Sequence, residues 1–267
     1  MEDMLPLCCT RLSDSESEDE QSILPLARPP AVPQGPIKRC LINIDLQKDF
    51  ISGSMPLKDA EAIIPIINTL AKEKFDLVVY SLDSHPEDHI SFVDNTALYT
   101  SVDTGLGIGR QPDTFNVGDS LVVSSHRYGL ITQRLWPRHC VRSTEGARLW
   151  PALELPLTAV LVQKGTESEV ESYTVFGNPA MQYDTGLHHL LHNFGITHIY
   201  LTGLPEDRCV AHSASEAIMH YNQVTVIEDA VRGVHEDLCA VMKEMIVSEG
   251  GRYMSSEEVI REIKSCH

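Results

Sequence analysis

Short apolar runs alternate with amphipathic segments through most of this chain, beginning at Cys40. The apolar runs predict strands and the amphipathic segments predict helices. The predicted strands span residues 40–45, 77–82, 158–163, 197–202, 223–227 and 252–254. The predicted helices span residues 60–72, 185–193, 208–221 and 236–247, with Gly195 ending the second and a Ser255–Glu258 capping box opening a last one. This alternation favours parallel βαβ units, in which ligands bind beyond the carboxyl ends of the strands.

The chain divides into a short tail and one large domain. Residues 1–37 join an acidic run to several prolines, which predicts a disordered acidic and proline-rich N-terminal tail. Residues 38–267 are expected to form the domain, because 42% of the 267 residues are hydrophobic and suffice for a substantial core. An insertion at about residues 93–135 interrupts the alternation, and both a lid and a surface loop without a role stay open for it.

The net charge and the cysteine content indicate which classes of partner and which cellular compartment to expect. The net charge of -17 argues against a nucleic-acid partner and fits a small-molecule substrate. No apolar stretch is long enough to span a bilayer, so no membrane partner is expected. Seven cysteines without regular spacing do not resemble a disulfide framework, which favours a cytoplasmic protein, with the nucleus as an alternative. A homo-oligomer stays open.

Three ionisable side chains lie where predicted strands end. Asp45 closes the first strand, Lys164 follows the third apolar run, and Cys209 lies just past the next run, in the segment GLPEDRCV. The positive end of the following helix is expected to favour the Cys209 thiolate, with Asp45 as base and Lys164 as a stabilising cation. Taken singly, they could be a turn cap, a solvated loop lysine and a small buried residue. Their shared position favours one catalytic site.

A second group of residues has the chemistry of a metal site. Asp83 and His85 are two residues apart just past a predicted strand, so extended backbone points both side chains to one side. His139 can supply a third ligand, whereas His89 is a rival that we rank beside the site rather than on the metal. An Asp-x-His pair is about as often a surface accident as a metal site.

These residues resemble the nicotinamidases, a family of isochorismatase-like cysteine hydrolases. The resemblance spans residues 40–264 and rests on several motifs in family order: IDLQKDF at 44–50, DSHPEDHISF at 83–92, WPRHCV at 136–141, Lys164–Gly165, Tyr173 and GLPEDRCV at 203–210.

The resemblance implies a fold, a site and a reaction. The fold is a three-layer α/β/α sandwich around a six-stranded, mostly parallel sheet. The implied catalytic residues are Asp45, Lys164 and Cys209. The implied ligands of one divalent metal, with Zn expected and Mn or Fe as alternatives, are Asp83, His85 and His139. Gln47 and His89 are expected to lie next to the ligands without binding the metal.

The implied substrate is nicotinamide, which is hydrolysed to nicotinic acid and ammonia through a thioester on Cys209. Phe50, Trp136 and Tyr173 are expected to hold the pyridine ring, although ordinary core packing is an equal alternative for Phe50.

Pro205 is a departure from the family pattern. Family members have a cis peptide before the nucleophile loop and take one oxyanion donor from the backbone N–H four residues before the cysteine. Proline at that position favours a cis Leu204–Pro205 bond but has no N–H to donate. The loss of one donor is worth roughly a hundredfold in rate.

Pro205 therefore leaves alternatives open. A related amidase acting on another small amide, or a weakly active ligand-binding paralogue, would also fit the sequence. An isochorismatase fits less well, because those enzymes typically lack the cysteine and this metal set. His188 and His192 have the i, i+4 spacing of a metal pair, but a polar helix face predicts that they are solvated.

Overall fold

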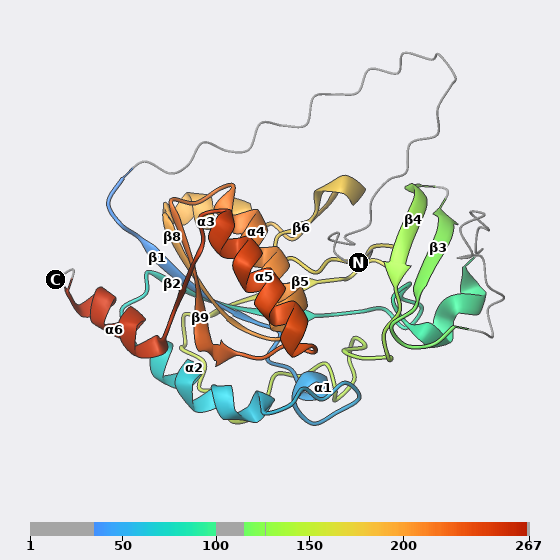
Figure 1. Ribbon diagram of the computed structural model, residues 1–267, viewed down its shortest axis with the longest axis horizontal. Coiled ribbons are helices and arrows are strands. Elements are labelled where there is room, and N and C mark those ends of the chain that lie inside the picture. Colours follow the sequence, from blue (N-terminus) through green and yellow to red (C-terminus); the bar gives the residue numbers. More distant parts are fainter. Residues whose placement is uncertain (1–34, 100–114, 126, 266–267) are drawn as a thin grey trace, which may run out of the picture.

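Six parallel strands form the central sheet of the computed structural model, which describes residues 35–99, 115–125 and 127–265 (Figure 1). The strands are β1 Arg39–Ile44, β2 Leu77–Asp83, β5 Val160–Lys164, β8 His198–Gly203, β9 Gln223–Val231 and β10 Arg252–Met254. Their order across the sheet is β10-β9-β8-β1-β2-β5, and every neighbouring pair is parallel. The predicted strands are confirmed, with ends that differ by up to four residues.

Helices cover both faces of this sheet. They are α1 Lys48–Ile51, α2 Ile64–Leu70, α3 Leu187–Phe194, α4 Ala211–Ile218, α5 Glu236–Ser248 and α6 Ser256–Ser265. Figure 1 shows α3, α4 and α5 on one face, and α2 and α6 on the other, so the predicted three-layer sandwich is confirmed. The end of α3 and the start of α6 carry the local sequence signals that were expected there. Gly195 ends α3 in the left-handed conformation, and the Ser255 hydroxyl and Glu258 carboxylate form the capping box before α6.

Two of the predicted helices are less regular than expected. The region predicted at 60–72 begins as the 3-10 helix η1 Ala60–Ile63 before α2. The region predicted at 208–221 begins as the π-helical turn η5 Glu206–Val210, which contains the predicted nucleophile, and continues as α4.

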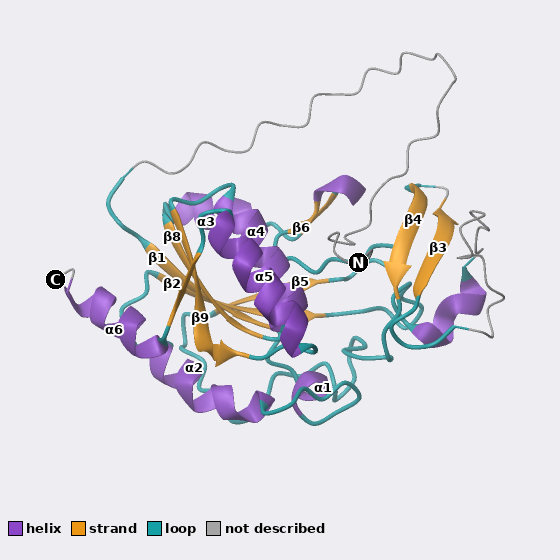
Figure 2. Cartoon of the chain, viewed as in Figure 1, coloured by secondary structure: helices purple, strands orange, loops and turns teal. Residues whose placement is uncertain are grey.

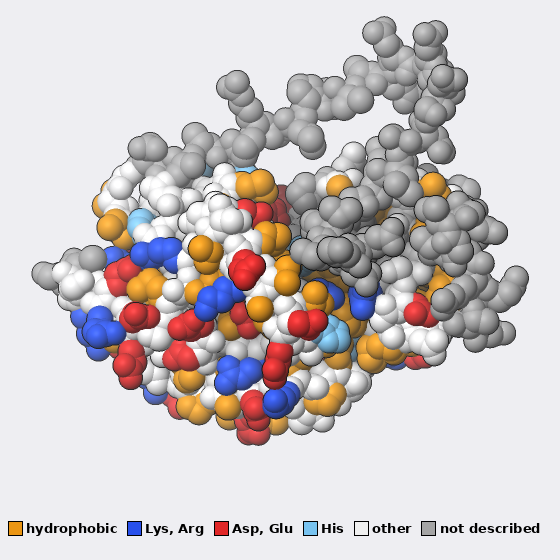
Figure 3. All heavy atoms as spheres, in the orientation of Figure 1, with side chains coloured by type: hydrophobic (Ala, Val, Ile, Leu, Met, Phe, Trp, Pro, Cys, Tyr) orange, Lys and Arg blue, Asp and Glu red, His pale blue; other side chains and the backbone are white. Residues whose placement is uncertain are grey.

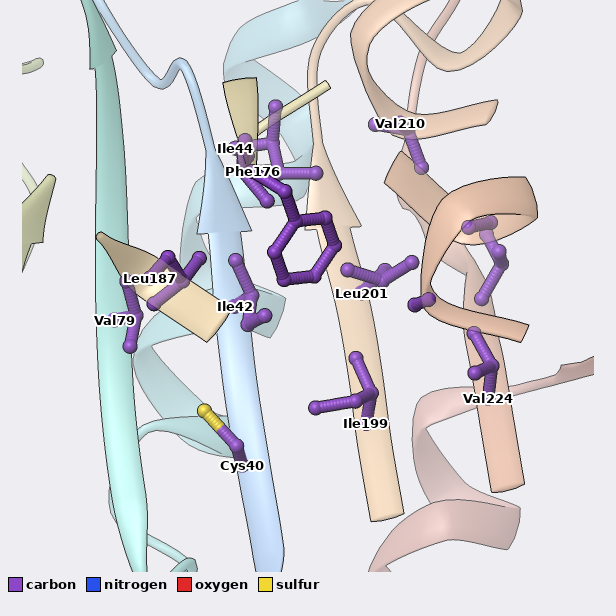
Figure 4. Close-up of a cluster of buried hydrophobic side chains, with 14 of the residues drawn as sticks. Cys40, Ile42, Ile44, Val79, Phe176, Leu187, Ile199, Leu201, Val210 and Val224 are labelled. Carbon is purple, nitrogen blue, oxygen red and sulfur yellow. The ribbon is translucent and has the colours of Figure 1, made fainter. Parts of the chain in front are cut away.

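Alternate residues of β1 supply the two hydrophobic cores. Cys40, Ile42 and Ile44 point toward α3 and α4, whereas Leu41 points toward α2 and α6. Figure 4 shows the first set beside Ile199 and Leu201 of β8. Because both faces are covered, β1 is fully buried, and its residues are apolar except Arg39 and Asn43, as is typical of a central parallel strand. Each fully buried Leu or Ile side chain contributes about 1.5–3 kcal/mol.

Gly203 lets the ends of β8 and β1 approach closely. Its φ is +111°, and a Cβ there would lie 2.0 Å from the carbonyl oxygen of Ile44. A larger residue would therefore push the two strand ends apart. This contact brings the loop after β8 next to Asp45.

The insertion forms a hairpin with a small core of its own. It contains the 3-10 helix η2 Val93–Leu98 and the antiparallel strands β3 Ser120–Ser125 and β4 Gly129–Arg134. Figure 2 shows this hairpin at one end of the molecule, beside the central sheet. Leu121, Val123 and Ile131 pack there with Ile90 and Val170. A second short hairpin joins β6 Gly177–Asn178 and β7 Tyr183–Asp184 around the 3-10 helix η4 Pro179–Met181.

Two further expectations concern the tail and the surface. The predicted disordered tail lies almost wholly outside the described residues, which begin at 35. Among the described residues, the helices are too short or too polar to cross a membrane. On the face that Figure 3 shows, described acidic and basic side chains are interspersed over α5 and α6.

Candidate active site

Asp45, Lys164 and Cys209 meet at the carboxyl end of the sheet. Asp45 follows β1, Lys164 ends β5, and Cys209 lies in η5 after β8. The Lys164 Nζ lies 2.9 Å from Asp45 Oδ2 and donates to Cys209 Sγ at 3.4 Å. All three side chains are buried. The structure thus brings together the three residues that the sequence singled out as base, cation and nucleophile.

Asp45 is held in place by an unusual backbone conformation and by Ser81. Its φ of +50° is in the left-handed region, which non-glycine residues rarely adopt. The Ser81 hydroxyl donates to Asp45 Oδ1 at 2.6 Å. Burial raises the pKa of Asp45, and the Lys164 ammonium opposes that shift. A carboxylate with a raised pKa is a stronger proton acceptor than an ordinary aspartate.

The surroundings of Cys209 disfavour its thiolate. Burial raises its pKa well above the usual value, although the Lys164 ammonium opposes the shift. Burial thus opposes the helix N-terminus, which was expected to favour the thiolate, because Cys209 is 4% exposed inside a single π-turn. Its proton must consequently be removed by a base, and the carboxylate of Asp45 lies within 4.8 Å of its sulfur.

Asp83, His85 and His139 converge beside this triad. Asp83 Oδ2 lies 3.5 Å from His85 Nε2 and 3.9 Å from His139 Nε2. The Nδ1 atoms of the two histidines bond to the carbonyl oxygens of Gly165 and Pro137, so both Nε2 atoms are directed at Asp83. Carbonyl partners on Nδ1 are typical of histidines that ligate a metal.

The chemistry of this group fits a divalent metal. His85 Nε2 is buried without a hydrogen-bond partner, which is costly unless another ligand satisfies it. Burial and the neighbouring His85 lower the pKa of His139 to about 4, so its imidazole is neutral and has a free electron pair. The Asp83 carboxylate, by contrast, raises the pKa of His85. Two imidazoles and a carboxylate form a common donor set for Zn, Mn or Fe.

Gln47 and His89 support the ligands, as expected. The Gln47 side-chain amide donates to the Asp83 carbonyl and accepts from the Asp83 N–H, both at 2.8 Å. The His89 ring stacks on His85 with 4.0 Å between centroids. Both His89 nitrogens are occupied, one by the Ser91 hydroxyl and the other by the Val170 carbonyl. His89 is thus oriented to support His85 and has no nitrogen left for a metal.

A small pocket, partly open to solvent, reaches Cys209 of the triad and Asp83 and His139 of the metal group. Its lining includes the three predicted aromatic residues, Phe50, Trp136 and Tyr173. The Trp136 indole N–H donates to the Tyr173 hydroxyl at 2.9 Å, and Phe50 packs against His139 with 5.4 Å between ring centroids. Phe50 is 1% exposed, so it is also part of the core. The aromatic walls of the pocket suit a flat ring.

The family model for the isochorismatase domain matches residues 39–258, which are most of the chain. The chain belongs to the isochorismatase family.

Several proteins similar to this chain are nicotinamidases. A nicotinamidase of Acinetobacter baylyi is 34% identical over 224 residues, which are 82% of this chain and 94% of that protein. The structure of an Acinetobacter baumanii nicotinamidase and pyrazinamidase has a TM-score of 0.69 at 30% identity, covering 85% of this chain and 100% of that one. A zinc complex of a Pyrococcus horikoshii pyrazinamidase has a TM-score of 0.62 at 28% identity, covering 82% and 99%.

This isochorismatase-family chain differs from the expected nucleophile loop in one respect. The predicted cis Leu204–Pro205 bond is wrong, because the bond is trans. The trans form is intrinsically favoured by about 0.5–1 kcal/mol even before proline. Here the flanking backbone groups also have hydrogen-bond partners in the trans form. The Leu204 N–H donates to Ile44, and the Pro205 carbonyl accepts from Arg208 and Val210. The absence of an N–H on Pro205 remains.

Two charged residues line the pocket that the sequence analysis did not assign to it. Glu171 is 5% exposed, and its carboxylate lies within 4.8 Å of ring nitrogens of His85 and His89. The Arg208 guanidinium lies 5.6 Å from the centre of the Trp136 ring. The sequence signal for each was its neighbour: Glu171 lies two residues before Tyr173, and Arg208 directly precedes Cys209. In contrast, none of the described residues at 93–135 lines the pocket, which favours a surface role for that part of the insertion.

Proposed function

We propose that this chain hydrolyses nicotinamide to nicotinic acid and ammonia, with Cys209 as nucleophile. The observation that carries the proposal is the Lys164 ammonium, which contacts both Asp45 and Cys209 below an aromatic pocket. The nicotinamidases among the relatives support the same substrate.

Proton transfer begins the reaction. Asp45 takes the proton from Cys209 Sγ, and the Lys164 ammonium stabilises the negative charge before and after this transfer. The thiolate attacks the carboxamide carbon and forms a tetrahedral intermediate. Asp45 then returns its proton to the amide nitrogen, the carbon–nitrogen bond breaks, and ammonia leaves a thioester on Cys209.

Hydrolysis of the thioester completes the cycle. Asp45 removes a proton from a water molecule, which attacks the thioester carbon. The carbon–sulfur bond then breaks, and the proton on Asp45 returns to the sulfur as nicotinic acid leaves. One base thus serves both halves of the reaction.

Asp83, His85 and His139 would hold a divalent metal beside this chemistry, and we propose zinc. The zinc complex of the Pyrococcus horikoshii neighbour and the unpaired His85 nitrogen support that choice. A bound metal supplies a Lewis acid that can bind the pyridine nitrogen and orient the ring. Phe50, Trp136 and Tyr173 would hold the ring faces, while Gln47 and His89 keep the ligands in position.

The test is ammonia release by Cys209→Ala, with Cys239→Ala as the matched control. Cys239 is a second free cysteine, outside the pocket. We expect Cys209→Ala to lose turnover and Cys239→Ala to keep it. A Cys209→Ala protein that releases ammonia from nicotinamide at the wild-type rate would rule out the scheme.

A related small-amide hydrolase is the second candidate function. Pro205 withholds one backbone donor from the pocket, and Arg208 adds a positive charge to its wall. Both features favour an amide that can accept a hydrogen bond from a guanidinium. Comparison of kcat/KM for nicotinamide, pyrazinamide and a set of carboxylate-bearing aromatic amides separates the two candidates.

A further inference from the structure

His188 of α3, Glu216 in the last turn of α4 and His220 just after α4 form a second cluster of possible metal ligands. Each can direct one ligand atom to within 4.8 Å of the others. The His188 Nε2 lies 3.4 Å from Glu216 Oε1, and the His188 and His220 rings are 4.4 Å apart between centroids. All three side chains are half-buried, and none lines the catalytic pocket.

The partner of His188 is not the one that its spacing suggests. His192, four residues later on α3, is exposed, whereas His188 faces α4. Glu216 and His220 are themselves four residues apart, at the end of α4 and one turn beyond it. Both side chains contact His188 directly, Glu216 through its carboxylate and His220 through its ring.

Neighbouring aromatic groups orient the His188 ring for this role. The ring stacks on Phe176 with 3.9 Å between centroids and an interplanar angle of 8°. Its Nδ1 lies 3.0 Å from the Tyr221 hydroxyl, which leaves Nε2 directed at Glu216. A polar partner on the other ring nitrogen fixes the tautomer and the direction of a metal-binding histidine.

His220 provides the independent observation. Its Nδ1 is inaccessible to solvent and has no hydrogen-bond partner. A buried ring nitrogen without a partner is costly, and a bound cation would satisfy it. The neighbouring Glu216 supplies the negative charge that such a cation needs.

We propose that His188, Glu216 and His220 bind a second divalent cation, of which zinc is the best match. Two imidazoles and one carboxylate make a three-ligand zinc site that water completes. The cation would join α3 to α4 and would stabilise the fold, because the unfolded chain does not hold the three ligands together. The π-turn that holds Cys209 continues directly into α4. A cation bound at the end of α4 would therefore help to fix the position of that turn.

Zinc binding by the full-length protein tests the proposal. The metal is removed with a chelator, and bound zinc is measured by equilibrium dialysis across a range of free zinc concentrations. At free zinc concentrations that fill the second site of the wild type, we expect His220→Asn and Glu216→Gln each to bind one zinc ion fewer per chain. This difference does not depend on whether the catalytic site is loaded, so it is independent of the proposed function.

His192→Asn is the matched control, because it removes an exposed histidine from α3 and should bind as much zinc as the wild type. Tyr221→Phe should weaken the second site by about tenfold or more, since it removes the hydrogen bond that orients His188. Circular dichroism confirms that each variant is folded. If both His220→Asn and Glu216→Gln bind zinc as the wild type does, the proposal is wrong. It is equally wrong if His192→Asn loses the same zinc.

Discussion

Lys164→Met removes the buried cation on which the catalytic site depends. At an effective dielectric constant of about 20, an ammonium 2.9 Å away stabilises the Asp45 carboxylate by about 6 kcal/mol. At 3.4 Å it stabilises a Cys209 thiolate by about 5 kcal/mol. The two values differ by only about 1 kcal/mol. Lys164 therefore stabilises a negative charge on Asp45 and on Cys209 to nearly the same degree, so the proton can move between them.

The loss of Lys164 therefore affects both stability and turnover. The Asp45 and Asp83 carboxylates would lie buried together without their shared cation, and breaking such a buried pair costs about 3–5 kcal/mol. Asp45 would then retain a proton and cease to act as a base. With about 5 kcal/mol lost from the thiolate, kcat should fall by more than about a thousandfold.

Urea denaturation and ammonia release measure the two effects. Lys243→Met is the control, because Lys243 also pairs with a carboxylate, Glu228, at 2.9 Å but on the surface. That exposed pair should contribute less than about 1 kcal/mol. A Lys164→Met protein that keeps its free energy of unfolding and stays within tenfold of the wild-type kcat would refute the reasoning.

Three further predictions follow from single contacts. Gly203→Ala should lower the free energy of unfolding by about 1–3 kcal/mol in urea titrations, because its Cβ would overlap the Ile44 carbonyl; unchanged stability would contradict the close approach. Burial, with the Arg208 charge, lowers the pKa of His212 to about 4, so the folded state binds fewer protons than the unfolded state between about pH 4 and 6.5. Stability should therefore fall by about 3 kcal/mol as pH drops through that window, and His212→Phe should flatten the slope measured by denaturation at several pH values; equal slopes would contradict it. Tyr173→Phe removes the acceptor of the Trp136 indole N–H, which should raise KM for nicotinamide about tenfold with little change in kcat; an unchanged KM would show that this bond does not shape the pocket.

Much of the fold could be predicted because its signals are local. Cys40, Ile42 and Ile44 alternate with Leu41 along one strand, and this pattern reports burial on both faces. Gly195 and the Ser255–Glu258 pair act on backbone groups within a few residues of themselves. The hairpin of the insertion was missed because its small core depends on Ile90 and Val170, which lie outside the insertion.

The candidate site was partly predictable for a geometrical reason. Carboxyl ends of parallel strands share one edge of the sheet, so Asp45, Lys164 and Asp83 had to lie close together once the strands were assigned. Glu171 and Arg208 follow no such rule. Glu171 reaches the pocket from the loop after β5 and Arg208 from the turn η5 after β8, and no local pattern predicts where such side chains point.

The order of residues alone thus determined the sheet, the helix ends and the meeting of three strand-end groups, since each depends on neighbours in the chain or on strand direction. Only the tertiary structure decided the pKa of Cys209, the trans Leu204–Pro205 bond and the partners of His188. Those properties arise from desolvation and from contacts between segments far apart in the chain. Their energies are set by the packed environment, which exists only when the whole domain has folded.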